Sequence, residues 1–215
     1  MSTAAEQEQA HEAHFESMEQ QAHAARLGMW VFLASEVLLF GALFALYASY
    51  RVHYPRAFHD AIEHNTKLLG SINTGVLLLS STIVACGVHA LRAGRRRLAA
   101  LLVAGTMSLG VVFLVIKMTE WLKHFSDGIY PGASGHYFQD HALAGYSEFW
   151  TLYFGMTGLH ALHVIIGLTV LGSMLVSLLR GHLTPATAHR LEIGAIYWHL
   201  VDLVWIFLWP LFYLA

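Results

Sequence analysis

The sequence predicts an all-α membrane protein, a polytopic bundle of five transmembrane helices. Of its 215 residues, 56% are hydrophobic and only 12% are charged, whereas soluble domains carry about 25% charged residues. Five separate stretches are also apolar over about 20 residues, the length that a helix needs to cross a bilayer. We therefore expect a transmembrane domain over residues 26–215, preceded by a polar tail over residues 1–25 that is rich in glutamate.

Each expected span is a mostly apolar run bounded by polar or turn-forming residues. The spans are expected at Leu27–Tyr50, Leu68–Leu91, Leu98–Leu122, Phe149–Leu179 and Ile193–Ala215. The segment 124–148, between the third and fourth spans, contains Gly, Ser, Pro and Asp residues that favour turns. It is the one substantial loop that the pattern predicts.

The positions of arginine and lysine in the short loops predict the orientation of the bundle. Seven of these residues lie on the N-terminal side of the membrane and four on the opposite side. The seven are Arg26, Arg92, Arg95, Arg96, Arg97, Arg180 and Arg190, and the four are Arg51, Arg56, Lys67 and Lys123. Because cytoplasmic loops carry the excess of basic residues, we expect the N-terminus inside and the C-terminus outside.

Several classes of function are excluded by composition and motif. Cys86 is the only cysteine, so an intrachain disulfide and a cysteine metal cluster are impossible. There is no basic block suited to nucleic acid, no phosphate-binding glycine loop and no Ser-His-Asp signature. We therefore assign no catalytic, cofactor-binding or metal-binding residue to the chain.

The first span contains an acidic residue, Glu36, near its middle. A charged side chain at that depth costs about 2.5–3.5 kcal/mol on insertion scales, so such residues are usually functional. At 100° per residue, a stripe of small residues lies on the side opposite Glu36 and is expected to pack against neighbouring helices. That stripe consists of Ala34, Gly41, Ala45 and Ala48. Two readings stay open for Glu36: a lipid-related or proton-related role, or a structural carboxyl bonded to another helix.

Polar residues in the second and third spans are expected to be structural. Asn73 can form hydrogen bonds to another helix, as polar residues in membrane helices do. Lys117 and Glu120 are spaced i, i+3 and therefore share one helix face. An ion pair between them is favoured over a proton relay, because charges in membranes usually pair.

The fourth and fifth spans carry histidines that need explaining. His160 and His163 share a face of the fourth span, and Glu192, His199 and Asp202 share a face of the fifth. Histidine is a common metal and haem ligand, and a haem between His160 and His199 is not excluded by spacing. Hydrogen-bonded packing histidines are the favoured interpretation.

Four stretches together resemble the cytochrome c oxidase subunit III family of haem-copper oxidases. They are "GMWVFLASEVLLFGALFALY", "INTGVLLLSSTIVACGVHAL", "TGLHALHVIIG" and "YWHLVDLVWIFLWPLFY", and they occur in the family's order. The resemblance covers residues 26–215. The long form of this family has seven spans, so the chain resembles the five-span bacterial form.

The resemblance implies an accessory subunit of an aerobic terminal oxidase in the bacterial plasma membrane. Such a subunit carries no redox centre, packs against subunit I alongside subunit II, holds structural phospholipid and supports proton uptake, while haem and copper lie in the partner subunits. The family's acidic residue falls on Glu36, and a lipid-binding basic residue falls on Arg180. The remaining family positions fall on His160, His163, Glu192, Trp198, His199 and Asp202.

The electron donor expected from this resemblance is cytochrome c, with quinol as the nearest alternative. A homologue associated with nitric oxide reductase is a further alternative within the family. Two other classes also stay open: a membrane cytochrome b with its own haem, and an independent ion transporter. The spans lack the Gly/Pro-broken helices that transporters use.

Overall fold

The computed structural model describes residues 18–130, 135, 138 and 143–214, and these residues form helices and connecting loops without strands. The helices are α2 (Met18–His53), α3 (Pro55–His64), α4 (Lys67–Arg92), α5 (Arg96–Ser126), α7 (Tyr146–Arg180) and α8 (Ala188–Tyr213), with a short 3₁₀ helix, η1 (Pro185–Thr187). Within the described residues, five helices are long and apolar enough to cross a membrane. The all-α prediction with five spans is therefore confirmed.

The chain divides into two units, Met1–Leu39 and Phe40–Ala215, and each is described by itself. The described part of the first unit is helical from Met18, well before the Leu27 at which the sequence predicted the first span. The predicted tail over residues 1–25 lies mostly outside the described residues. The second unit contains the rest of α2 and all later helices.

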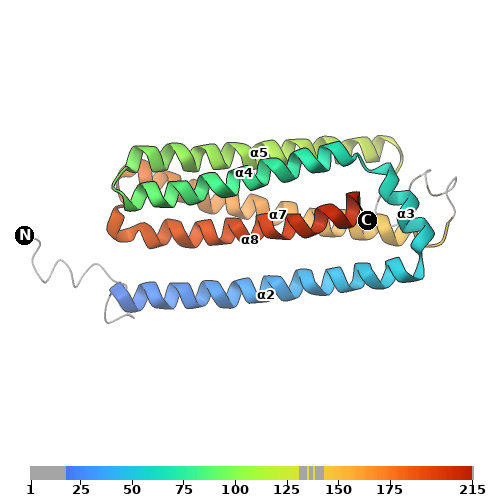
Figure 1. The fold of residues 1–215 in the computed structure, drawn as a ribbon, viewed down its shortest axis with the longest axis horizontal. Helices are drawn as coiled ribbons and strands as arrows, with labels where there is room; N and C mark the ends of the chain where they lie inside the picture. The colour runs from blue at the N-terminus through green and yellow to red at the C-terminus, as the bar shows by residue number, and fades with distance from the viewer. Residues whose placement is uncertain (1–17, 131–134, 136–137, 139–142, 215) are drawn as a thin grey trace, which may run out of the picture. The chain divides into compact units, whose positions relative to one another are not determined.

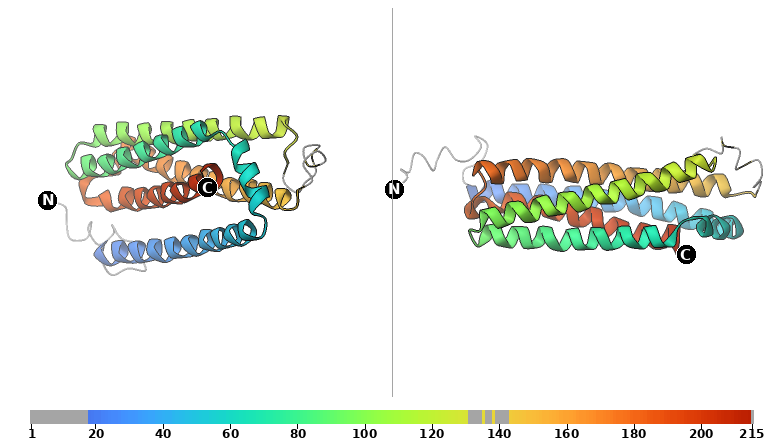
Figure 2. Two further views of the ribbon diagram at one scale, coloured as in Figure 1. Left: turned by 45° about the vertical axis from the view of Figure 1, so that its right-hand side comes forward. Right: turned by 90° about the horizontal axis from the view of Figure 1, so that it is seen from above.

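Four helices of the second unit, α4, α5, α7 and α8, lie side by side as an antiparallel bundle (Figures 1 and 2). The loops 93–95 and 181–187 join α4 to α5 and α7 to α8 at one end, here called the hairpin end. Gly94 and Gly181 in these loops have φ of 74° and 81°. Glycine adopts this left-handed conformation at helix ends without a steric penalty, so it favours both reversals.

The opposite end of the bundle carries α3, a helix that the sequence pattern did not predict. Its proline, Pro55, stands at the first position, where the missing N–H is tolerated. Phe58 is fully buried and meets Tyr47 and Phe149, with ring centroids 5.2 Å apart in both pairs. A ten-residue amphipathic helix is too short to stand out beside apolar spans, and tertiary packing stabilises it.

The packing of α2 after Leu39 overturns one prediction. Gly41, Ala45 and Ala48 are exposed, whereas Phe40 and Tyr47 are each only 2% exposed. The Tyr47 hydroxyl donates to the carbonyl of Leu211 at 2.5 Å. The small-residue stripe is therefore not the packed face here, because large aromatic side chains bury more surface. This correction concerns the part of α2 that belongs to the second unit.

Candidate functional site

A cluster of four polar side chains lies buried among α5, α7 and α8. Its members are Lys117, Glu120, Tyr153 and Tyr213, named here the core polar cluster. Lys117 Nζ lies 3.3 Å from Glu120 Oε2 and donates to both tyrosine hydroxyls at 2.8 Å. The Tyr153 and Tyr213 hydroxyls in turn donate to Glu120 Oε1 at 2.7 and 2.6 Å. The ion pair predicted from the i, i+3 spacing is thus present, and two further helices join it.

The hydrogen bonds of the core polar cluster form a closed set. An ammonium group has three N–H donors, and Lys117 has three acceptors around it. Each phenol accepts from Lys117 and donates to Glu120, so both of its roles are filled. Such a set of charge-assisted bonds links three helices at one depth of the bundle.

The cluster is buried and has aromatic rings around it. The Lys117 and Glu120 side chains are each only 3% exposed. Lys117 Nζ lies 4.5 Å from the ring centroid of Tyr153 and 5.4 Å from that of Trp205, within the range of cation–π attraction. His124 continues the line toward α3, with Nε2 3.9 Å from Glu120 Oε1. Charges in such a setting interact strongly, because little solvent screens them.

A second set of polar contacts joins α8 to α4. The Trp205 indole donates to the Thr74 hydroxyl at 3.1 Å, and the Trp198 indole donates to the Ser80 hydroxyl at 2.9 Å. Nearer the hairpin end, the Ser81 hydroxyl and His199 Nδ1 lie 2.5 Å apart. Hydroxyls of the second span thus bind another helix and give Trp198 and His199 structural partners. Asn73, which was expected to form such a bond, has no hydrogen-bond partner among the described residues.

Trp198 fits its place because two neighbouring helices present glycine to it. A Cβ atom added to Gly110 on α5 would lie 2.6 Å from Trp198 Cη2. One added to Gly167 on α7 would lie 2.8 Å from Trp198 Cε3. Both distances are shorter than nonbonded contact allows, so the absence of a side chain at these glycines makes room for the buried indole.

At the hairpin end, Arg92 of α4 pairs with Glu192 of α8. The Arg92 guanidinium donates to Glu192 Oε2 at 2.6 Å, and the two side chains are 54% and 38% exposed. Glu192 was expected to be a buried polar residue. It is instead half-exposed, because it lies one turn from the start of α8 and can reach the loop side.

Three of the expected polar residues are buried without a hydrogen-bond partner among the described residues. They are Asn73 and His160, which are fully buried, and Asp202, which is 3% exposed. The His160 ring packs against two aromatic rings, with centroid distances of 5.4 Å to Phe113 and 5.1 Å to Trp205. His199 bonds to Ser81 instead, so the structure gives the two histidines of the haem hypothesis different neighbours.

The other candidates are not members of the core polar cluster. His163 Nδ1 lies 2.8 Å from the carbonyl of Leu159, and its ring meets Phe40 at 5.4 Å. Arg180 is the exposed last residue of α7. Glu36 is half-buried and belongs to the Met1–Leu39 unit. The lipid-related role expected for Glu36 and for Arg180 stays a prediction.

The sequence pattern missed the contributions of Tyr153 and Tyr213. Tyr153 shares a face with His160 in the fourth span, and Tyr213 lies near the end of the fifth, where aromatic residues are common in membrane helices. The depth of each residue in the membrane would have been a useful signal. In an antiparallel bundle, residues near the start of the fourth span lie level with the ends of the third and fifth, where Lys117 and Glu120 lie.

Comparison with known proteins links the chain to one family and to several named relatives. The family described as cytochrome c oxidase subunit III matches residues 5–215. Quinol oxidase subunit 3 of Bacillus spizizenii is 32% identical over 202 residues, which cover 92% of this chain and 91% of the relative. Its counterpart in Bacillus subtilis strain 168 is 31% identical with the same coverage. Probable quinol oxidase subunit 3 of Staphylococcus aureus strain USA300 is 28% identical over 88% of each chain.

Proposed function

Because the chain belongs to the cytochrome c oxidase subunit III family, we propose that it is the subunit III of a haem-copper oxidase that takes its electrons from a quinol. The family membership and the five apolar helices make it a multi-pass protein of the bacterial plasma membrane. Its assembly with other oxidase subunits follows from the same membership.

The choice of quinol rests on one observation. The relatives with 32% and 31% identity, aligned over 92% of this chain, are both named quinol oxidase subunit 3. This favours quinol over cytochrome c, the donor expected first from the sequence. Cytochrome c stays the second candidate because the family description carries that name.

The donor is tested on the complex that copurifies with this chain. Oxygen consumption is measured with a short-chain quinol and, separately, with reduced cytochrome c. Rapid oxygen uptake with quinol alone supports the proposal, and uptake driven by cytochrome c alone overturns it. The sequence of the copurifying subunit II is an independent readout, since a copper-binding domain there marks a cytochrome c oxidase. Nitric oxide consumption without oxygen uptake would instead indicate the nitric oxide reductase homologue.

Within the complex this chain serves as an accessory subunit without a redox centre, which packs on subunit I. The core polar cluster supports a structural role, because its hydrogen bonds join three helices of the bundle. Haem and copper belong to the partner subunits. A visible spectrum of the isolated chain with stoichiometric Soret absorption would overturn this part and favour a membrane cytochrome b. Ion transport by the chain alone in liposomes would favour the transporter class.

Glu36 and Arg180 each contact structural phospholipid and support proton uptake. The motivation is their match to the family's positions and the half-buried carboxyl of Glu36 in an apolar helix. The Glu36→Gln and Arg180→Ala complexes are compared with the native complex for retained phospholipid and for loss of activity during turnover. Native lipid content and native durability in both variants would reject this role.

A further inference from the structure

A groove of about 450 Å³ lies between α4 and α5 at the hairpin end of the bundle. It belongs wholly to the Phe40–Ala215 unit. Most of its lining is apolar, and polar groups are confined to a few positions. The lining residues are Ala85, Cys86, His89, Ala90, Ala93, Arg95, Leu98 and Leu102.

The shape of the groove follows from the spacing of its lining residues. The lining residues of α4 recur about once per helical turn: Ala85 and Cys86, then His89 and Ala90, and then the loop residue Ala93. On α5, Leu98 and Leu102 are one turn apart and form the facing wall. At 1.5 Å per residue, this groove runs about 12 Å from the loop into the membrane-spanning part of the hairpin. That length suits the upper part of a lipid acyl chain.

The groove has one arginine, Arg95, among its lining residues. Arg95 is exposed in the loop between the two helices and lines the groove. The nearby Arg92 is engaged with Glu192 at 2.6 Å, whereas Arg95 has no ion-pair partner among the described residues. The groove lining contains no carboxylate. A guanidinium without an ion-pair partner among the described residues therefore lines this apolar groove, in the loop that joins two membrane-spanning helices.

We infer that this groove binds an anionic phospholipid of the bilayer, with its headgroup at Arg95 and an acyl chain along Ala85, Ala90 and Leu102. Arginine suits a phosphate because its planar fork donates two parallel hydrogen bonds. His89, exposed on the same rim, supplies a further polar contact for a headgroup. Neither Glu36 nor Arg180, the two residues expected to contact lipid, is among the residues that line this groove.

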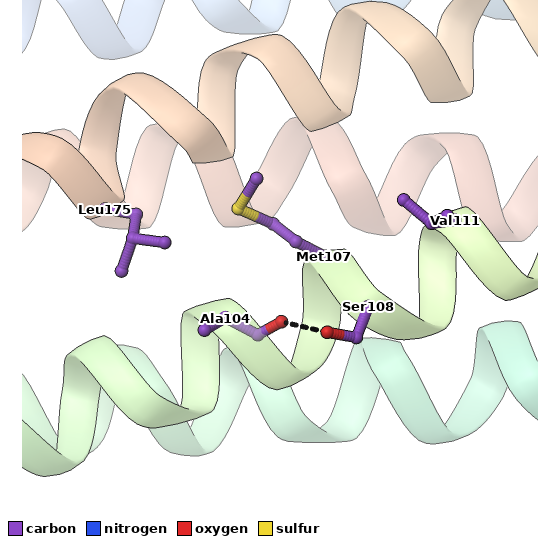
Figure 3. Close-up of a pocket in the computed structure, with 5 residues that line it drawn as sticks. All are labelled: Ala104, Met107, Ser108, Val111 and Leu175. Carbon is purple, nitrogen blue, oxygen red and sulfur yellow. Dashed lines mark hydrogen bonds between the residues drawn. The ribbon is translucent and has the colours of Figure 1, made fainter.

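A second groove of the same unit offers a matched comparison. It has a volume of about 400 Å³ and lies on α5 and α7 (Figure 3). Its lining residues are Ala104, Met107, Ser108, Val111 and Leu175. None of these carries a charge, and the Ser108 hydroxyl already donates to the carbonyl of Ala104 at 3.0 Å. This groove can contact acyl chains but has nothing to select a headgroup.

The experiment uses the intact oxidase in vesicles that contain a photoreactive phospholipid. The lipid carries a diazirine on its acyl chain and either a phosphatidylglycerol or a phosphatidylcholine headgroup. After illumination, labelled peptides are located by mass spectrometry. Phosphatidylglycerol should label residues 85–102 about fivefold more than phosphatidylcholine, which is the preference expected from one arginine at a membrane surface. The α5–α7 groove should be labelled equally by both lipids.

Variants separate the groove from general surface charge. Arg95→Gln should bring the labelling ratio at residues 85–102 to about one, and Arg95→Lys should keep most of the preference. Arg97→Gln removes an exposed charge of the same segment that does not line the groove, so it should leave the ratio unchanged.

Three results would overturn the inference, and the first two need no variant. The first is equal labelling of residues 85–102 by the two lipids in the native complex. The second is labelling confined to the α5–α7 groove, which would show that a neighbouring subunit covers the α4–α5 groove. The third is an equal loss of preference in Arg95→Gln and Arg97→Gln, which would assign the effect to the charge of the whole loop.

Discussion

Two ion pairs of this chain stand in opposite surroundings. The Lys117–Glu120 pair lies inside the bundle, with both side chains 3% exposed, and two tyrosine hydroxyls complete its bonding. The Arg92–Glu192 pair lies at the hairpin end, with side chains 54% and 38% exposed. Both pairs contribute to holding helices together, but the first acts through α7 and α8 and the second links α4 to α8 directly.

The comparison teaches that the distance between the charged atoms does not by itself predict how much each pair contributes to stability. Arg92 and Glu192 are closer, at 2.6 Å against 3.3 Å for Lys117 and Glu120. Solvent nevertheless screens the exposed pair, and each of its partners can return to water if the other is removed. A buried partner that loses its counter-charge keeps its full desolvation penalty. We therefore expect the sensitivity to mutation to follow burial.

The largest effect is expected from Lys117→Met. It leaves the Glu120 carboxylate buried without its cation, and breaking one side of a buried pair costs about 3–5 kcal/mol. The measurement is the temperature at which this chain aggregates when the detergent-solubilised oxidase is heated. The double variant Lys117→Met, Glu120→Gln should recover part of the loss, since no lone charge remains. A double variant less stable than either single variant would contradict this explanation.

A smaller loss is expected from Tyr213→Phe, which keeps the ring and removes one hydroxyl of the core polar cluster. Hydrogen bonds to charged groups contribute about 1.5–3 kcal/mol, and this hydroxyl contacts both Lys117 and Glu120. Tyr197→Phe is the control, because the Tyr197 hydroxyl donates to the neutral carbonyl of His163 at 3.2 Å. Equal losses of thermal stability in the two variants would show that the charges add nothing.

Gly110→Ala tests close packing around Trp198 as a source of stability that involves no charge. The added methyl group would lie 2.6 Å from the indole, and overpacking of this kind costs about 1–3 kcal/mol. Gly155→Ala on α7 is the control, because a Cβ there meets nothing within 4 Å and alanine favours a helix. The same heating assay should show a lower transition temperature for Gly110→Ala and not for Gly155→Ala. An unchanged transition temperature in Gly110→Ala would contradict the close packing of the indole against Gly110.

The smallest effect is expected from Arg92→Gln. Exposed pairs contribute roughly 0.2–1 kcal/mol, and this contribution should shrink further when salt screens the charges. The shift of the thermal transition relative to the native complex is measured at low and high salt. A loss as large as that of Lys117→Met, or one insensitive to salt, would remove the contrast between the two pairs.

The spans and the residues of the candidate site were predictable to different degrees. Apolar length located all five spans, because the bilayer imposes that length on any crossing helix. The i, i+3 spacing indicated the pairing of Lys117 with Glu120, since it is a property of a single helix. The short helix α3 and the exposure of Gly41, Ala45 and Ala48 were not predicted, because both depend on what the neighbouring segments present.

By itself, the sequence determined that the chain is a helical membrane protein of five spans, and its motifs indicated the family. These properties follow from hydrophobicity and from local residue spacing, which depend on neighbouring positions in the sequence and not on contacts between distant segments. Only the tertiary structure decided that Tyr153 and Tyr213 complete the bonding of Lys117 and Glu120, and that Arg95 lines an apolar groove. The physical reason is that such contacts depend on the depth and rotation of separate helices, which are set when side chains from all of them pack at once.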